Sequence, residues 1–284
     1  MSLIAQLSAF PSETVQVAGE SCVQFRRARG PGAGDRVTHV LLHGIGSASA
    51  SWLAQLQQVA GSASPANHVL AWDAPGYGAS TALPMDTPQA SDYASRLWLW
   101  LDALRVSEPV TLVGHSLGAL MAGAAARAQP RRVGQLVLLA PAAGYARAPA
   151  ELREKKLADR LTNLARLGPA GMAQARASAM LAGDASAAQL AFVQHVMAQI
   201  DPAGYTQAAR MLSGGDLLSD LHAVTCSTLI ASGDADTITP PQGCQALARD
   251  AGVPYESLGA VGHSCPLQAA AQVNRLLGLQ EDAL

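Results

Sequence analysis

Short apolar runs alternate with segments of helical periodicity along most of this 284-residue chain. The runs are continuously apolar, as strands are when helices cover both faces of a parallel sheet. Two more strands are expected within 14–29, on either side of a turn at 18–20. The pattern predicts a mostly parallel, doubly wound α/β sheet. The strand-like runs cover 38–44, 67–73, 109–114, 135–140, 227–233 and 254–259, and the helical segments cover 51–60, 90–105, 117–129, 242–251 and 266–277.

The alternation stops between the sixth and seventh predicted strands. There the sequence contains amphipathic helical stretches, interrupted by Gly and Pro, at 151–168, 170–183 and 188–200. Because the sheet pattern resumes afterwards, we expect a helical cap inserted after the sixth strand rather than a separate domain. The predicted cap covers 141–215, and the predicted core covers 1–140 and 216–284. With 49% hydrophobic and 14% charged residues, the chain can bury a core of this size.

One serine stands between two glycines at the boundary of a predicted strand and a predicted helix. Gly114 and Gly118 flank Ser116 in "LVGHSLGAL", residues 112–120. A serine on a sharp strand-to-helix turn needs small neighbours, so that its strained backbone fits and its hydroxyl is exposed. The N–H of Leu117 would point at the same space from the helix N-terminus, where anions are favoured. Ser116 is therefore the candidate nucleophile.

A serine nucleophile needs a base, and the base needs an orienting acid. Of the seven histidines, His263 follows the last predicted strand, in a loop before the final helix. The side chain of His115, on the sharp turn, is expected to point elsewhere. Asp234 and Asp236 both follow the penultimate strand, where open α/β sheets carry functional groups, and the residues alone hardly separate them. The histidines expected to be structural or at the surface are His39, His68, His195 and His222.

Four stretches make the chain similar to the α/β-hydrolase superfamily, and within it to small bacterial esterases, enol-lactonases and carbon–carbon bond hydrolases. They are "LLHGIGSASASW", "AWDAPGYGAS", "GHSLGA", and "GDADTITPP" followed by "GHS". The resemblance implies an α/β-hydrolase fold with a triad in the chain order Ser116, Asp236, His263. The family's G-x-x-D pattern matches Gly233 and Asp236, and so favours Asp236 over Asp234.

The same resemblance implies roles for the residues around the triad. The family's "HG-x" pattern matches His43, Gly44 and Ile45. It implies that the backbone N–H groups of Ile45 and Leu117 form the oxyanion hole and that His43 is structural. Asp73 belongs to a turn in the resemblance and is also expected to be structural. A serine nucleophile argues against haloalkane dehalogenase and epoxide hydrolase chemistry, where family members carry aspartate.

The leading hypothesis is a cofactor-free serine hydrolase that cleaves a carboxylic ester or lactone through an acyl-enzyme. The alanine-rich cap indicates a mainly apolar pocket, and hence a small to medium acyl group or lactone. Three alternatives stay open: hydrolysis of a carbon–carbon bond in a ring-cleavage product, a perhydrolase or haloperoxidase-like activity, and a ligand receptor that retains the triad. Four cap side chains face either the substrate or the packed interior of the cap: Met172, Arg176, Met180 and Tyr205.

Composition argues against several kinds of partner. The net charge of −2, without a dense Lys/Arg cluster, gives nucleic-acid binding little support. No apolar stretch of about 18 residues suggests a membrane span, and the N-terminus does not resemble a secretion signal. We therefore expect a small-molecule substrate and a cytoplasmic protein, whereas the sequence leaves the oligomeric state open. No metal is expected, because the cysteines lack metal-ligand spacing and resemble reduced, mostly buried thiols: Cys22, Cys226, Cys244 and Cys265.

Overall fold

The computed structural model describes residues 1–61 and 66–280, which contain one eight-stranded sheet. Its strands are β1 (Glu13–Gln16), β2 (Cys22–Arg29), β3 (His39–Leu42), β4 (His68–Trp72), β5 (Val110–His115), β6 (Val133–Leu139), β7 (Ser227–Ser232) and β8 (Tyr255–Ser257). They lie in the order β1-β2-β4-β3-β5-β6-β7-β8. From β4 to β8 all neighbours are parallel, while β1 and β2 add an antiparallel edge. The predicted strands and the mostly parallel sheet are confirmed.

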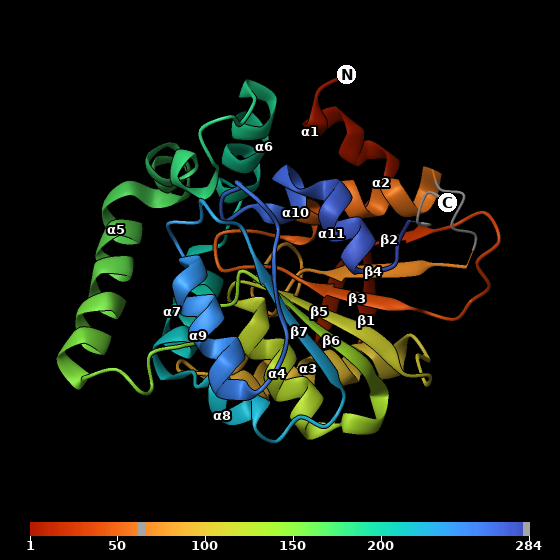
Figure 1. Ribbon diagram of the computed structural model, residues 1–284, viewed down its shortest axis with the longest axis horizontal. Helices are drawn as coiled ribbons and strands as arrows, with labels where there is room; N and C mark the ends of the chain where they lie inside the picture. The colour runs from red at the N-terminus through yellow and green to blue at the C-terminus, as the bar shows by residue number, and fades with distance from the viewer. Residues whose placement is uncertain (62–65, 281–284) are drawn as a thin grey trace.

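Helices cover both faces of this sheet, and each face has its own apolar core. Successive strand residues point to opposite faces, so Val40 and Leu42 of β3 join one core while Leu41 joins the other. Figure 1 shows the two helical layers on either side of the strands. One layer contains α3 (Ala90–Ala103), α4 (Gly118–Ala128) and α9 (Pro241–Ala251), and the other contains α2 (Leu53–Gly61), α10 (Cys265–Gln268) and α11 (Ala270–Leu276).

The chain between β6 and β7 is helical, as predicted. It forms α5 (Ala150–Arg176), α6 (Ala187–Met197), α7 (Pro202–Gly214) and α8 (Leu217–Leu221). Inside α5 the chain kinks at Gly168 (φ 60°, ψ 176°), and Pro169, which lacks an N–H, opens the second half. In Figure 1, α5 and α6 lie beyond one end of the strands. The insertion after the sixth strand is confirmed, and the cap boundaries at 141 and 215 stay a prediction.

Two helical features differ from expectation. Residues 266–277 form two short helices instead of one, because the backbone of Ala269 (φ −108°, ψ 39°) leaves the helical conformation. No glycine or proline marks that break in the sequence. A short helix, α1 (Leu3–Gln6), begins after Ser2, whose hydroxyl caps it by accepting the N–H of Ala5. Among all helices in the described ranges, none combines the length and the apolar character needed to cross a membrane.

Candidate active site

Ser116 lies on the turn between β5 and α4. Its φ is +53°, a left-handed conformation that costs a residue with a side chain about 1–3 kcal/mol. Backbone hydrogen bonds hold it there. The N–H of Ser116 donates to the Leu139 carbonyl at 2.9 Å, and its carbonyl accepts from the N–H groups of Ala119 (3.1 Å) and Ala142 (3.0 Å). Its neighbours therefore fix the turn, and the side chain lines a cavity at the carboxyl end of the sheet.

Three glycines make this turn sterically possible. A β-carbon on Gly118 would lie 2.4 Å from the Leu42 carbonyl oxygen, and one on Gly114 would lie 2.6 Å from the Gly118 carbonyl oxygen. Gly44 approaches the serine from the other side, where a β-carbon would lie 3.0 Å from Ser116 Cβ. The glycines are required by close backbone approach, which explains why the sequence places small residues around Ser116.

His263 and Asp236 form a buried hydrogen-bonded pair. Nδ1 of His263 lies 2.8 Å from Oδ2 of Asp236, and the two side chains are 2% and 0% exposed. The other carboxylate oxygen accepts the backbone N–H groups of Ile238 (2.7 Å) and Thr239 (3.0 Å). Burial raises the pKa of Asp236, but the contact with His263 and these backbone bonds outweigh burial and leave the pKa below its usual value. The ionised carboxylate orients the imidazole with Nδ1–H toward it.

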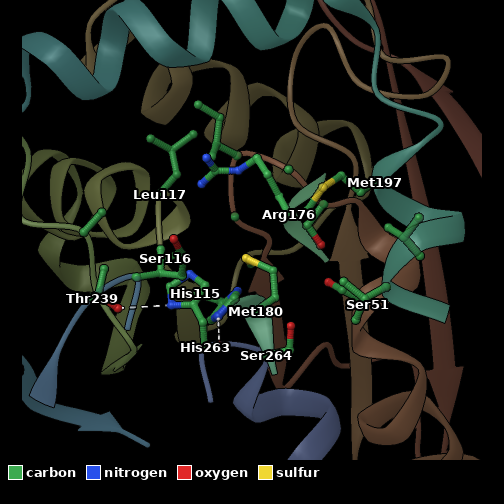
Figure 2. A pocket seen from close by; sticks show the side chains of 18 of the residues that line it. Ser51, His115, Ser116, Leu117, Arg176, Met180, Met197, Thr239, His263 and Ser264 are labelled. Atoms are coloured by element: carbon green, nitrogen blue, oxygen red, sulfur yellow. Dashed lines mark hydrogen bonds between the residues drawn. The ribbon is translucent and has the colours of Figure 1, made fainter. Parts of the chain in front are cut away.

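Thr239 contacts both members of this pair, and the sequence analysis did not identify it. Its Oγ1 lies 2.9 Å from Asp236 Oδ2 and 3.0 Å from the Ala140 carbonyl oxygen. It also lies 3.1 Å from His263 Nδ1 (Figure 2). A hydroxyl has one proton, so it donates to one of these oxygens at a time and can accept from Nδ1–H. Its position three residues after Asp236 was the only available signal.

Asp234, the other aspartate of the same loop, points elsewhere. It is exposed, and its Oδ1 accepts the hydroxyl of Ser257 at 2.7 Å. Its backbone N–H donates to the Gly259 carbonyl at 2.8 Å. The structure thus brings Asp236, and not Asp234, to His263.

His115 differs from expectation. Its ring packs against that of His263 with centroids 4.9 Å apart, and it lines the cavity beside Ser116. Burial, together with the neighbouring His263, lowers the pKa of His115 to about 3, so the ring is neutral and its Nε2–H donates to the His263 carbonyl at 2.8 Å. The expectation that this side chain points away was wrong. As the last residue of β5, His115 still follows the alternation of the strand and lies on the same face as Val113.

Ile45 and Leu117 line the same cavity as Ser116. In the described part of the chain, neither of their backbone N–H groups has a protein acceptor. The loop at Ile45 is held by its carbonyl, which accepts the Tyr77 hydroxyl at 2.6 Å. Leu117 precedes α4, whose N-terminus adds positive partial charge. Both amides are therefore available to an anionic oxygen bound beside Ser116.

His43 and Asp73 form a second buried network, away from this cavity. His43 Nε2 accepts the N–H of Ala74 at 3.0 Å, and its Nδ1 lies 2.8 Å from the Gly44 carbonyl oxygen. Asp73 accepts the N–H of Ser49 at 2.7 Å. Burial lowers the pKa of His43, which keeps its imidazole neutral. These contacts join two loops and leave both side chains outside the wall around Ser116.

The cavity itself has a volume of about 260 Å³ and lies between the core and the inserted helices. Figure 2 shows Arg176 near Leu117 and Ser116, and Met180 near His263 and Ser264. All four cap side chains that the sequence left undecided line this cavity: Met172, Arg176, Met180 and Tyr205. Its described wall contains no Asp or Glu, and most of it is apolar.

No metal-binding cluster accompanies this cavity. Within residues 1–61 and 66–280, no three His, Cys, Asp or Glu side chains gather in a way that could hold a metal ion. The four cysteines are free: Cys244 and Cys265 are buried, and Cys22 and Cys226 are half-buried.

The family model described as "Alpha/beta hydrolase family" matches residues 40–276, which include strands β4 to β8, most of β3 and all residues that line the cavity. The chain belongs to the alpha/beta hydrolase family. The chain also shares its fold with solved structures whose alignments cover nearly all of its length. An esterase from Thermogutta terrifontis has a TM-score of 0.79 at 22% identity, with 94% of this chain and 97% of that chain covered. An enol-lactonase from Burkholderia xenovorans has a TM-score of 0.79 at 19% identity, with 94% and 98% covered.

Sequence similarity to curated members of the alpha/beta hydrolase family is partial. The chain is 38% identical over 114 residues to the 2-hydroxy-6-oxononadienedioate/2-hydroxy-6-oxononatrienedioate hydrolase of Paraburkholderia phymatum. That alignment covers 40% of this chain and 38% of the relative. The chain therefore matches little more than a third of the length of such relatives.

Proposed function

We propose that this protein is a cofactor-free serine hydrolase that cleaves a carboxylic ester or lactone through an acyl-enzyme. The observation that supports this most is the 2.8 Å contact between His263 Nδ1 and Asp236 Oδ2 on the same cavity wall as Ser116. Ser116 Oγ attacks the acyl carbon, while His263 Nε2 takes the hydroxyl proton and delivers it to the leaving oxygen. Water, deprotonated by the same nitrogen, then attacks the acyl-enzyme, and the proton returns to Ser116.

The surrounding groups have separate roles in this scheme. Asp236 holds the imidazole tautomer and stabilises its positive charge. The N–H groups of Ile45 and Leu117 stabilise the oxyanion, by about 3 kcal/mol per donor. Residues 141–215 act as a cap that covers the cavity and selects the acyl group. The free cysteines fit a reducing compartment, and we place the protein in the cytoplasm.

A second candidate is hydrolysis of a carbon–carbon bond in a ring-cleavage product, with the same three side chains. The 38% identity to the hydrolase of P. phymatum over 114 residues favours it. The two candidates differ in the bond attacked, so a panel of p-nitrophenyl esters, lactones and ring-cleavage products separates them. Absence of turnover on every member of such a panel would instead favour a ligand receptor that retains the triad.

A fluorophosphonate probe tests the nucleophile. We expect one label, on Ser116, and we expect Ser116→Ala to abolish labelling and to reduce kcat by a factor on the order of 10⁶. Ser51→Ala is the matched control, because Ser51 lines the same cavity but its hydroxyl donates to the Ala48 carbonyl at 2.8 Å. Labelling that persists in Ser116→Ala, or turnover within tenfold of the parent, would remove Ser116 from the mechanism.

A further inference from the structure

The cavity wall has an unbalanced positive charge. Arg160 and Arg176, both on α5, contribute two guanidinium groups to the wall, and the described wall contains no carboxylate. Arg160 donates to the Tyr145 hydroxyl at 3.4 Å and to the Lys156 carbonyl at 3.0 Å. Arg176 has neither an ion pair nor a hydrogen bond to any side chain or carbonyl in the described part of the chain. A guanidinium that faces a cavity without a counterion is available to an anion from outside the protein.

Tyr205 adds a neutral donor beside the two arginines. It lies on α7, which packs against α5, and it is 3% exposed while lining the same cavity. Burial raises the pKa of its hydroxyl, and the nearby charges of Arg176 and Arg160 oppose that shift. The hydroxyl therefore stays protonated at neutral pH and can donate. Two guanidinium groups and one phenol thus gather on the cap side of the cavity.

The rest of the wall includes apolar side chains, among them Met172, Met180 and Val196. Figure 2 shows Arg176 reaching into the cavity on the side of Leu117 and Ser116. Guanidinium groups bind carboxylate and phosphate oxygens through paired N–H donors, which favours Arg at such positions. Apolar side chains in the same wall fit the hydrocarbon part of a substrate that carries an anionic group.

We propose that the substrate cleaved at Ser116 carries an anionic oxygen group, a carboxylate or a phosphate, that binds Arg176, Arg160 and Tyr205 on the cap side of the cavity. This inference rests on the proposed serine hydrolase function and names its substrate class: an acyl chain with an anionic end. It adds an anionic end to the small to medium acyl group that the alanine-rich cap indicates. Because Arg176 is exposed to solvent, its contribution is screened, and we expect a preference of about tenfold, equal to about 1.4 kcal/mol.

Two esters of equal chain length test the inference on the full chain. The p-nitrophenyl monoester of glutarate ends in a carboxylate, whereas p-nitrophenyl valerate ends in a methyl group. We expect kcat/KM about tenfold higher for the glutarate monoester. Arg176→Gln should remove that preference, because it lowers kcat/KM for the glutarate monoester about tenfold more than kcat/KM for the valerate. Arg166→Gln is the matched control, because Arg166 lies exposed on the same helix outside the cavity wall and loses the same charge.

A binding measurement covers the case in which neither ester is hydrolysed. Glutarate and propyl phosphate should each slow fluorophosphonate labelling of Ser116 in the parent and lose this effect in Arg176→Gln. The anion that protects at the lower concentration identifies the oxygen group that the cavity takes.

Several outcomes would overturn the anion subsite. Equal kcat/KM for the two esters would do so, as would equal loss of both in Arg176→Gln or the same change in Arg166→Gln. Absence of protection by both anions would overturn it where no ester is hydrolysed. Absence of probe labelling at Ser116 contradicts the serine hydrolase proposal instead, so the two failures are distinguishable.

Discussion

The two walls of the cavity are built in different ways. On the core wall, Asp236, Thr239 and His263 are tied to one another and to backbone groups by hydrogen bonds of 2.7–3.1 Å. On the cap wall, Met180 is a flexible thioether and Arg176 has no protein partner among the described residues. Polar contacts therefore hold the side chains of the core wall in one geometry, as a catalytic site needs, whereas the side chains of the cap wall lack such contacts.

The walls still meet at fixed points. Gly76, in the loop after β4, lies so close to Gly204 of α7 that a β-carbon on Gly204 would be 1.9 Å from the Gly76 carbonyl oxygen. Gly144, after β6, has φ +83°, and a β-carbon there would be 2.0 Å from the Gly215 carbonyl oxygen. The first contact holds α7 against the core, and the second joins the two ends of the inserted segment to each other. Freedom on the cap wall therefore belongs to its side chains.

Replacing Asp236 should have the largest effect on the core wall. Asp236→Asn keeps the shape of the side chain, but an amide favours the wrong imidazole tautomer, so we expect kcat to fall by roughly 10⁴. Asp234→Asn, two residues away and exposed, should change kcat by less than twofold. Steady-state kinetics on one activated ester compares the two variants. A larger loss for Asp234→Asn would mean that a different loop conformation carries out the reaction.

The stability of the core in acid is the second test. His39 is buried with its Nε2 2.8 Å from the Leu277 carbonyl oxygen, and burial lowers its pKa to about 4. The unfolded chain binds that proton near pH 6.5, so the free energy of unfolding falls as pH drops from 6.5 toward 4, by about 1.4 kcal/mol per unit for this histidine. His39→Gln should reduce the loss between pH 6.5 and 5 by about 2 kcal/mol in urea denaturation.

His222→Gln is the control for that measurement, because the imidazole of His222 is exposed and contacts the Asp250 carbonyl at the surface. An unchanged acid slope in His39→Gln would show that this histidine does not stay neutral in the folded protein. His115, with a pKa lowered to about 3, contributes in the same direction. The buried histidines thus lower the stability of the core as the pH falls.

The sequence predicts those features of the two walls that depend on residues adjacent in the chain. The strands and the turn at Ser116 follow from continuous apolar runs and from glycines adjacent in sequence, so they could be predicted. The choice of Asp236 needed the family's G-x-x-D pattern, because the direction of a loop side chain depends on tertiary contacts such as the Asp234 N–H to Gly259 carbonyl bond. Thr239 and Arg176 lie beside segments that are distant in sequence, and the periodicity of the sequence does not predict such contacts.

A larger side chain on the cap wall tests whether that wall selects the acyl chain. Met180→Trp adds an aromatic ring to the cavity, so acyl chains that extend past it should lose binding, at about 0.8 kcal/mol per excluded methylene. We expect kcat/KM for a hexanoate ester to fall about tenfold relative to the acetate ester, while fluorophosphonate still labels Ser116. Met85→Trp, on an exposed methionine outside the cavity, should leave the ratio unchanged. An unchanged ratio in Met180→Trp would remove this side chain from substrate selection.

Replacing Thr239 should have the smallest effect on kcat, and it tests whether the hydroxyl positions the Asp236–His263 pair. Thr239→Val keeps the shape but removes the hydroxyl that lies 2.9 Å from Asp236 and 3.1 Å from His263. The carboxylate keeps its two backbone donors and the imidazole, so the pair should persist with a looser orientation. One hydrogen bond to a charged group contributes about 1.5–3 kcal/mol when lost outright. Since the remaining contacts compensate in part, we expect kcat to fall about threefold to tenfold with KM unchanged.

Thr239→Ser distinguishes positioning from packing, because it restores the hydroxyl and removes only a methyl group. It should recover most of the kcat that Thr239→Val loses, and the pH dependence of kcat should shift in the valine variant alone. Equal losses in the serine and valine variants would assign the effect to packing of the methyl group. In that case the hydrogen bonds of Asp236 to the backbone and to His263 would suffice to hold the imidazole, and the core wall would need fewer polar contacts than it has.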